Sequence, residues 1–230
     1  MKLYKEVIAV LLISCISFQL SAQILDKQQK SIASISALTA KSDWEDLKSE
    51  LSKGLDNGLT INQIKEELVH LYAYVGFPKS IMGLRTFLTV LDERKANGIK
   101  DNWGKEASPI DYTSPKYERG KKVLEELTKN PLSETKPDYQ QFSPEIETFL
   151  KEHLFADIFE RDVLSFQQRE LITVSALIAL GNVEPMLKGH LGICIKQGLT
   201  KDQLIQVVET LKPYLNNYKL KSANDIIEGL

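Results

Sequence analysis

The feature that most constrains the fold is an internal repeat, because two long segments of the chain match in order and spacing. The matched residues include Gln28-Gln29-Lys30 with Gln167-Gln168-Arg169, Ser36-Ala37-Leu38 with Ser175-Ala176-Leu177, Gly58-Leu59-Thr60 with Gly198-Leu199-Thr200, and Tyr74 with Tyr214. With one single-residue gap, the offset holds along the whole stretch, which is typical of a duplicated structural unit. We therefore predict two copies of one unit, copy one at about 26–96 and copy two at about 160–230.

Each copy has the periodicity of helices, with apolar residues three and four positions apart. The predicted helices are 28–40 and 44–57 in copy one, 167–180 and 184–197 in copy two, and a third helix after Thr60 or Thr200. Thr60 with Gln63, and Thr200 with Gln203, fit the capping box that begins a helix. Because no segment shows the alternation of a strand, the predicted fold is all-α, with the two repeats packed as a pseudo-dimer.

The predicted domains follow from the repeat and from the composition between its copies. They are a signal peptide at 1–22, the first repeat at 23–96, a linker with one helix at 97–143, and the second repeat at 144–230. Residues 98–116 are rich in Gly, Pro, Ser and Asp and are predicted as loop. We also expect loop at 130–143 and a helix at 144–159, while Gly76-Phe77-Pro78 should interrupt the third helix of copy one.

The N-terminus has the pattern of a secretory signal peptide. Two lysines in the first six residues precede the apolar run Val7 to Ile13, and Ala22 offers a small residue for cleavage. The run is shorter than the roughly 20 apolar residues that a membrane span needs. We therefore expect an exported protein, periplasmic or secreted, whose mature chain keeps the single cysteine Cys194. An alternative is lipidation at Cys15, since Leu12 to Cys15 resembles a lipobox.

Composition excludes several classes of function. The 29 basic and 31 acidic residues give a net charge of -2, which argues against a dedicated nucleic-acid binder. The three histidines lie outside any cysteine or aspartate cluster, so we expect no metal site. No glycine-rich phosphate loop or dinucleotide fingerprint is present, and we expect no cofactor.

The motifs of the two copies resemble one known family. Copy two carries Arg169-Glu170-Leu171-Ile172-Thr173, Ala176 to Ala179, His190 and Gly198-Leu199-Thr200, preceded by Tyr117 to Gly120, Phe155 to Ile158 and Arg161. Copy one carries Gly58-Leu59-Thr60, Glu66-Glu67, His70, Tyr74 and Gly76-Phe77-Pro78. In order and spacing these resemble the carboxymuconolactone decarboxylase family, which shares the alkylhydroperoxidase-D-like helical fold. The resemblance implies a small-molecule substrate and a homo-oligomer, with a trimer as one form.

The resemblance also implies a chemistry and the residues that perform it. Loss of carbon dioxide from a carboxylated lactone leaves an electron pair that the lactone carbonyl must accept, and a proton must then reach carbon. His190 is the expected proton donor and Glu170 its partner, since a carboxylate orients and stabilises a charged imidazole. Arg161 is expected to bind a substrate carboxylate, and Tyr74 and Phe77 to shape the pocket. The resulting activity would be that of a cofactor-free lyase or isomerase.

Two alternatives remain open at this point. The peroxidase branch of the superfamily needs two thiols, but its cysteine positions hold Val183 and Met186 here, which disfavours an antioxidant function. A non-catalytic binding module is the other alternative. Copy one has Ser31 and Glu50 at the positions of Glu170 and His190, while copy two lacks the Gly-Phe-Pro turn. The copies therefore either share one composite pocket or have lost their sites.

Overall fold

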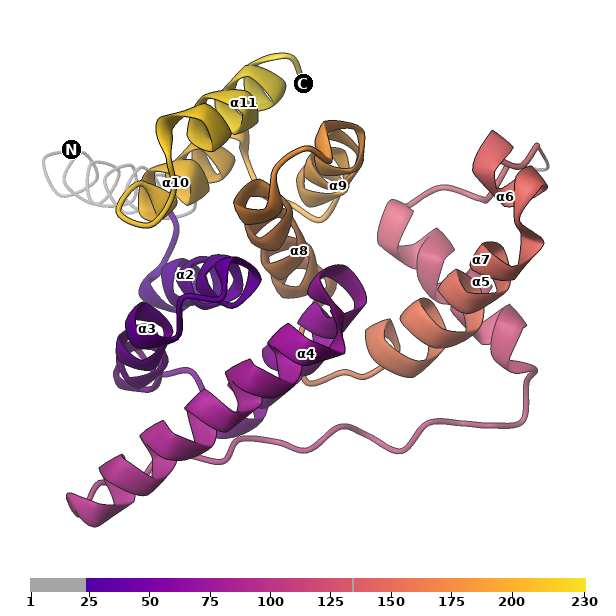
Figure 1. Cartoon of the computed structure of the whole chain (residues 1–230). Helices are drawn as coiled ribbons and strands as arrows, with labels where there is room; N and C mark the ends of the chain where they lie inside the picture. The colour runs from indigo at the N-terminus through magenta and orange to yellow at the C-terminus, as the bar shows by residue number, and fades with distance from the viewer. Residues whose placement is uncertain (1–23, 134) are drawn as a thin grey trace, which may run out of the picture.

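The computed structural model describes residues 24–133 and 135–230, and in that part of the chain it contains helices and no strand, which confirms the all-α prediction. The helices are α2 (Lys27–Lys41), α3 (Trp44–Asp56), α4 (Ile61–Ala96), α5 (Lys116–Thr128), α6 (Asp138–Phe142), α7 (Pro144–Thr148), the π-helix η1 (Phe149–Phe159), α8 (Phe166–Leu180), α9 (Glu184–Lys196), α10 (Lys201–Leu211) and α11 (Asn217–Glu228). Figure 1 shows α2 and α8 at the centre, with α5, α6 and α7 set to one side. The predicted signal peptide and Cys15 lie outside the described residues.

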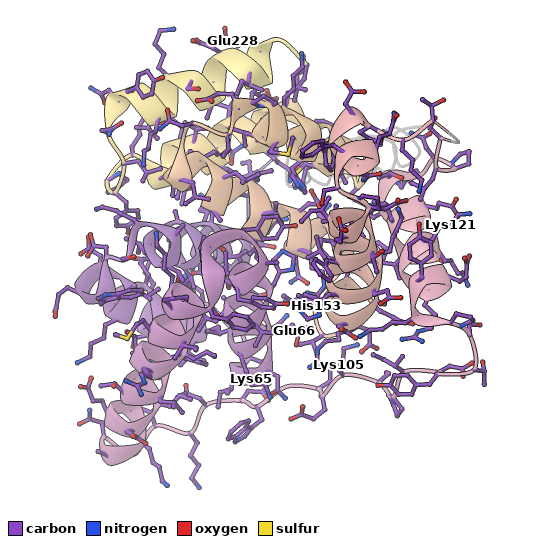
Figure 2. The ribbon with its side chains drawn as sticks, turned by 45° about the vertical axis from the view of Figure 1, so that its right-hand side comes forward. Lys65, Glu66, Lys105, Lys121, His153 and Glu228 are labelled. Carbon is purple, nitrogen blue, oxygen red and sulfur yellow. The ribbon has the colours of Figure 1, made fainter. Side chains whose placement is uncertain are left out.

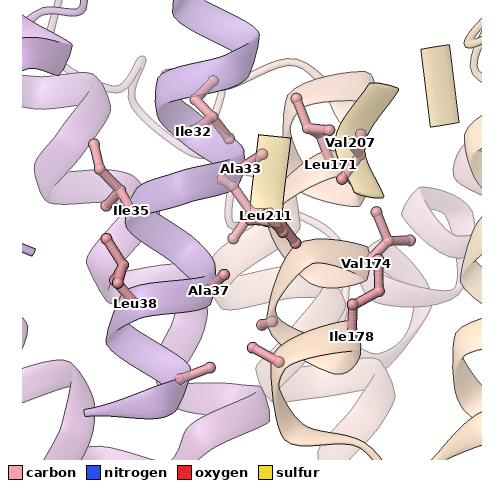
Figure 3. Packing of buried hydrophobic residues seen from close by; sticks show 14 of the residues in the cluster. Ile32, Ala33, Ile35, Ala37, Leu38, Leu171, Val174, Ile178, Val207 and Leu211 are labelled. Atoms are coloured by element: carbon pink, nitrogen blue, oxygen red, sulfur yellow. The ribbon is translucent and has the colours of Figure 1, made fainter. Parts of the chain in front are cut away.

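The centre of the fold is the packing of α2 against α8. Small side chains such as Ala33 and Ala37 allow other helices to approach α2 closely, so the helix is buried along ten consecutive residues, from Ser31 to Ala40. Figure 3 shows Ile35 and Leu38 on α2 and Val174 on α8 among the apolar side chains of this core. Burial of so much apolar surface is the main force that holds the helices together.

The same local structures recur in copy one and copy two. Gly58 and Gly198 both have a φ of 96°, a conformation that favours glycine, and each precedes the capping box that begins the third helix. Lys79 Nζ donates to the carbonyl of Ala40, and Lys219 Nζ donates to the carbonyl of Ala179 in the same way. These matching features place α2, α3 and α4 in the same local relation as α8, α9 and α10.

Interruptions of the third helices follow the glycine and proline positions. In copy one, Gly76 has a φ of 81° and a ψ of 160°, which kinks α4 just before Pro78 and confirms the expected break. In copy two, α10 ends at Leu211, before Pro213, and α11 follows. Within the described part of the chain, no helix is both long and apolar enough to cross a bilayer.

The segment between the copies forms a small helical unit with its own core of Val123, Leu127, Phe155 and Phe159. One prediction needs correction here, because the expected loop 130–143 contains the short helix α6. The expected helix 144–159 is confirmed in its bounds, as α7 followed directly by the π-helix η1. In η1 the hydrogen bonds span five residues, as from the Glu160 amide to the Phe155 carbonyl at 3.0 Å. Apolar spacing does not distinguish this winding from an α-helix.

Candidate functional site

The two residues expected to carry the chemistry are in contact. Glu170 lies on α8 and His190 on α9, and His190 Nδ1 is 2.8 Å from Glu170 Oε2. The Glu170 side chain is fully buried, whereas 23% of the His190 side chain is exposed. A buried carboxylate can therefore orient a histidine that solutes can reach. His190 Nε2, the ring nitrogen without a partner among the described residues, is the atom available for proton transfer.

Tyr74 brings copy one to this pair. Its ring meets the His190 ring edge-on, with centroids 5.8 Å apart and an interplanar angle of 80°. Burial, and then the nearby Glu170 carboxylate, raise the pKa of Tyr74 above its usual value, so its phenol stays protonated. The hydroxyl lies near Thr173 without a hydrogen bond of normal geometry, and Glu170 Oε1 is also unpaired among the described residues. These two buried atoms are a donor and an acceptor that a polar substrate group could meet.

A network of ion pairs near Glu170 and His190 joins copy one to copy two. Glu66 on α4 accepts one bifurcated hydrogen bond from Arg161 Nε, with distances of 2.9 and 3.0 Å to its two oxygens, and one hydrogen bond from Arg169 at 2.8 Å. Arg169 is fully buried and also donates to the carbonyl of Arg161 at 2.7 Å. In Figure 2 Glu66 lies near the middle of the molecule. The structure thus places Arg161, expected at a substrate carboxylate, against a protein carboxylate.

His70 extends this network toward Tyr74. Its Nε2 is 2.9 Å from Thr173 Oγ1, and its Nδ1 is 3.3 Å from an Arg169 nitrogen. Its ring also contacts Tyr74 and Phe159, with centroid distances of 5.2 and 5.0 Å. Burial, Arg169 and His190 hold the pKa of His70 well below its usual value, so the ring is neutral at pH 7. His70 therefore positions its neighbours.

Phe77 is not brought to the pair. It is 62% exposed and stacks on Tyr72, with ring centroids 4.4 Å apart and an interplanar angle of 13°. The Gly76 kink turns the chain here, so that the Gly-Phe-Pro turn presents its phenylalanine to Tyr72 and to solvent. No described contact joins Phe77 to Glu170 or His190, so its predicted role in shaping the pocket is not supported by the structure.

A cavity of about 690 Å³ lies beside the ion network. Arg161, Phe159 and Arg119 line it, together with residues at the start of α8. Phe159 separates it from His70, since it contacts the His70 ring on one side. The cavity lining does not include Glu170 or His190. Arg161 therefore lines this cavity while its Nε is held by Glu66.

Sequence reasoning assigned no role to Arg169 or to Glu66, although both lie in quoted motifs. The signal that could have found them is an arginine on a helix whose other residues are mostly apolar. A buried arginine needs a carboxylate partner, because an unpaired buried charge is costly. Which carboxylate it finds depends on contacts across about a hundred residues, and the sequence does not give these.

Thiol chemistry has no support from Cys194, the cysteine that lies within the described residues. Cys194 is buried, and burial, followed by the Glu170 carboxylate, raises its pKa well above the usual value. A reactive cysteine needs the opposite pKa shift and access to solvent.

Among residues 24–133 and 135–230, no group of three or more His, Cys, Asp or Glu side chains is arranged to hold a metal ion.

Comparison with known proteins finds relatives of the C-terminal part of the chain. Residues 144–228 match the family model described as "Carboxymuconolactone decarboxylase family". A 4-carboxymuconolactone decarboxylase from Acinetobacter baylyi (strain ATCC 33305 / BD413 / ADP1) is 28% identical over 94 residues, which cover 40% of this chain and 69% of that protein. Glu170 and His190 both fall inside the residues matched by the family model. The C-terminal part of the chain is therefore similar to the carboxymuconolactone decarboxylase family.

Proposed function

We propose that this protein is a cofactor-free lyase or isomerase that acts on a small carboxylated lactone or a related acid. The observation that carries the proposal is the 2.8 Å contact between His190 Nδ1 and the buried Glu170 carboxylate. A partly exposed imidazole held by a buried carboxylate is the arrangement used for proton transfer near neutral pH. The family match of the same residues supports the choice of substrate class.

In the proposed reaction, the bond between the substrate carboxylate and the ring carbon breaks. Carbon dioxide leaves, and the electron pair moves into the lactone carbonyl to give an enolate. The Tyr74 hydroxyl, kept protonated by burial, donates a hydrogen bond to the oxygen that gains charge. His190 then delivers a proton from Nε2 to carbon, and Glu170 stabilises the imidazolium form that precedes this transfer.

The test is decarboxylation of 4-carboxymuconolactone by the purified chain without residues 1–22. We expect turnover in the wild type and a loss of roughly 10²–10⁴-fold in His190→Gln, the usual contribution of general acid–base catalysis. His153→Gln is the matched control, since His153 Nδ1 is also held by a carboxylate, Asp157, at 2.9 Å, but on the exposed face of η1. This control should keep wild-type turnover.

Absence of turnover in the folded wild-type protein would reject this substrate. A thermal-shift series with the lactone would then separate binding without catalysis from no binding, because a ligand of the native state raises the melting temperature. Stabilisation without turnover would favour the binding module. Equal loss of turnover in His153→Gln and His190→Gln would reject the assigned proton donor.

The proposal includes export and self-association. Export rests on the pattern of residues 1–22, and mass spectrometry of the protein secreted by its host cell tests cleavage after Ala22. Self-association rests on the family resemblance and on exposed apolar residues along the second half of α4. Phe77, Ile81 and Leu88 are all exposed at helical spacing, and light scattering of the purified protein measures the oligomer mass.

A further inference from the structure

A second site occupies the related position at the other end of the core. It is built by α2 and α3 from copy one and by α10 and the turn after it from copy two, the reverse of the Glu170–His190 site. By the repeat offset, Ser31, Ser34, Glu50 and Tyr214 stand where the first site has Glu170, Thr173, His190 and Tyr74. The contacts agree, since Tyr214 lies beside Ser34 and Glu50 as Tyr74 lies beside Thr173 and His190.

A cavity of about 560 Å³ opens at this place, which we call the Glu50 cavity. Its lining combines one buried carboxylate, one phenol, two serines and three lysines. Binding pockets for small molecules usually range from about 300 to 1,000 Å³, so the volume suits such a ligand. The lining residues of the Glu50 cavity come from α2, α3, α10 and the turn after α10, and Figure 1 shows these helices on the side of the molecule away from α5, α6 and α7.

The buried carboxylate of Glu50 is the feature that indicates a bound ligand. The residue is only 6% exposed, and its Oε1 accepts from Lys53 Nζ at 2.9 Å. Its Oε2 is buried and makes no hydrogen bond of normal geometry with a described residue, although the Tyr214 hydroxyl lies near the carboxylate. Leaving a buried acceptor unpaired costs free energy, and the cost is larger when the group is charged. Because Glu50 lines the cavity, a hydroxyl donor on a bound molecule could supply the missing partner.

Tyr214 and Ser34 add neutral polar groups beside Glu50. Burial, followed by the nearby Glu50 carboxylate, raises the pKa of Tyr214 to about 12, so the phenol stays protonated. Ser34 is buried on α2 and faces the same cavity. These groups can donate to or accept from a hydroxyl, which suits the cavity to binding a polar molecule.

The rim of the cavity is cationic. Lys27 and Lys30 lie in the first turn of α2, next to the N-cap Asp26, whose carboxylate is occupied by the Gln29 amide at 2.7 Å. Neither lysine forms a salt bridge with another described residue, whereas Glu209 on the opposite rim is paired with Lys212 at 2.5 Å. With Lys53, these side chains favour an anionic group at the mouth.

We infer that the Glu50 cavity binds a small organic acid that carries a hydroxyl group, with its carboxylate at Lys27 and Lys30 and its hydroxyl at Glu50 Oε2. This binding site does not depend on the function proposed for His190. At the position of the His190 imidazole this cavity holds the Glu50 carboxylate, so the inference concerns binding and assigns no proton transfer to the cavity.

Calorimetric titration with malate, and with succinate, which lacks the hydroxyl, tests this inference. We expect saturable malate binding at millimolar concentration and about tenfold weaker succinate binding, the factor that one hydrogen bond to a charged group supplies. Glu50→Gln should remove most of the preference for malate. Lys30→Gln should weaken both acids by a similar, several-fold factor and keep the preference. Circular dichroism of each variant checks that it is folded.

His190→Gln is the control that separates the two sites, and it should bind malate as the wild type does. Amide shifts on α2, α3 and α10 should report the bound acid. The inference is overturned if wild-type protein binds malate no better than succinate, if folded Glu50→Gln keeps the full preference, or if His190→Gln abolishes binding. None of these results decides whether His190 catalyses decarboxylation, so each proposal can fail alone.

Discussion

The two sites built on the repeat differ in chemistry although their backbones are alike. Each takes two helices from one copy and a tyrosine from the other copy, Tyr74 on α4 or Tyr214 in the turn after α10. One holds a buried carboxylate and an accessible imidazole, whereas the other holds a serine and a buried carboxylate at the same places. The comparison teaches that this scaffold fixes where a site can lie, and that a few side chains decide what it can do.

The sites also differ in what surrounds them. The helical unit between the copies packs against α9, where Ile193 joins its apolar core and Gln197 donates to the Leu127 carbonyl at 2.6 Å. The described lining of the Glu50 cavity contains residues of copy one and copy two alone. The helical unit between the copies therefore covers part of the surroundings of the Glu170–His190 site, but it does not cover the Glu50 cavity.

The largest difference in stability between the two copies should appear at Arg169 and Lys30, which occupy equivalent positions of the repeat. Arg169 is fully buried on Glu66, whereas Lys30 is exposed at the rim of the Glu50 cavity. Arg169→Met should lower the free energy of unfolding by about 3–5 kcal/mol, because it leaves buried polar partners uncompensated. Lys30→Met should change it by less than about 0.5 kcal/mol. Urea unfolding measures both, and equal effects would contradict the asymmetry described here.

A smaller effect on stability is expected in the helical unit between the copies, where α5 packs against η1. A Cβ on Gly120 would stand 1.7 Å from the Lys151 carbonyl oxygen, so Gly120→Ala forces α5 away from η1. We expect a loss of about 1–3 kcal/mol in the free energy of unfolding. Gly189 on α9 has open space around it, and Gly189→Ala should stabilise by up to about 1 kcal/mol through helix propensity. Thermal unfolding of both variants tests this opposition of signs.

The third difference depends on pH and concerns Glu67, whose position in copy two holds Val207. Glu67 is buried and accepts from Ser36 Oγ at 2.7 Å, and burial raises its pKa well above the usual value. A raised pKa in the folded state makes stability fall as pH rises from about 4.5 toward that pKa, by up to about 1.4 kcal/mol per pH unit. Glu67→Gln should flatten this slope. A variant whose stability falls as steeply as that of the wild type would reject the explanation.

Much of the repeat framework could be predicted because its signals are local. The Thr60–Gln63 and Thr200–Gln203 capping boxes and the break at Gly76 all lie within a few residues of the structure they specify. The contact of Glu170 with His190 could also be anticipated, since successive helices in an antiparallel pair must face one another. In these places the sequence pattern and the packing impose the same geometry.

The rest depended on contacts that local patterns do not carry. The π-helix η1 has an apolar spacing compatible with an α-helix, so its different winding is set by the residues packed around it. Arg161 was expected to meet a substrate, but its Nε binds Glu66, which is 95 residues away in the chain. Phe77 was expected at the pocket, but the direction of its side chain is set by the kink at Gly76 and by the Tyr72 ring.

The way each site draws on both copies has a consequence for how the chain can vary. In a dimer of identical subunits, any substitution appears in both sites at once, so a change that suits one site is forced on the other. Here Glu50 and His190 hold related places but are encoded separately. Each site can therefore change alone, while the shared core of α2 and α8 keeps both in place. A single chain of this kind can therefore carry different side chains at the two related positions of one symmetric frame.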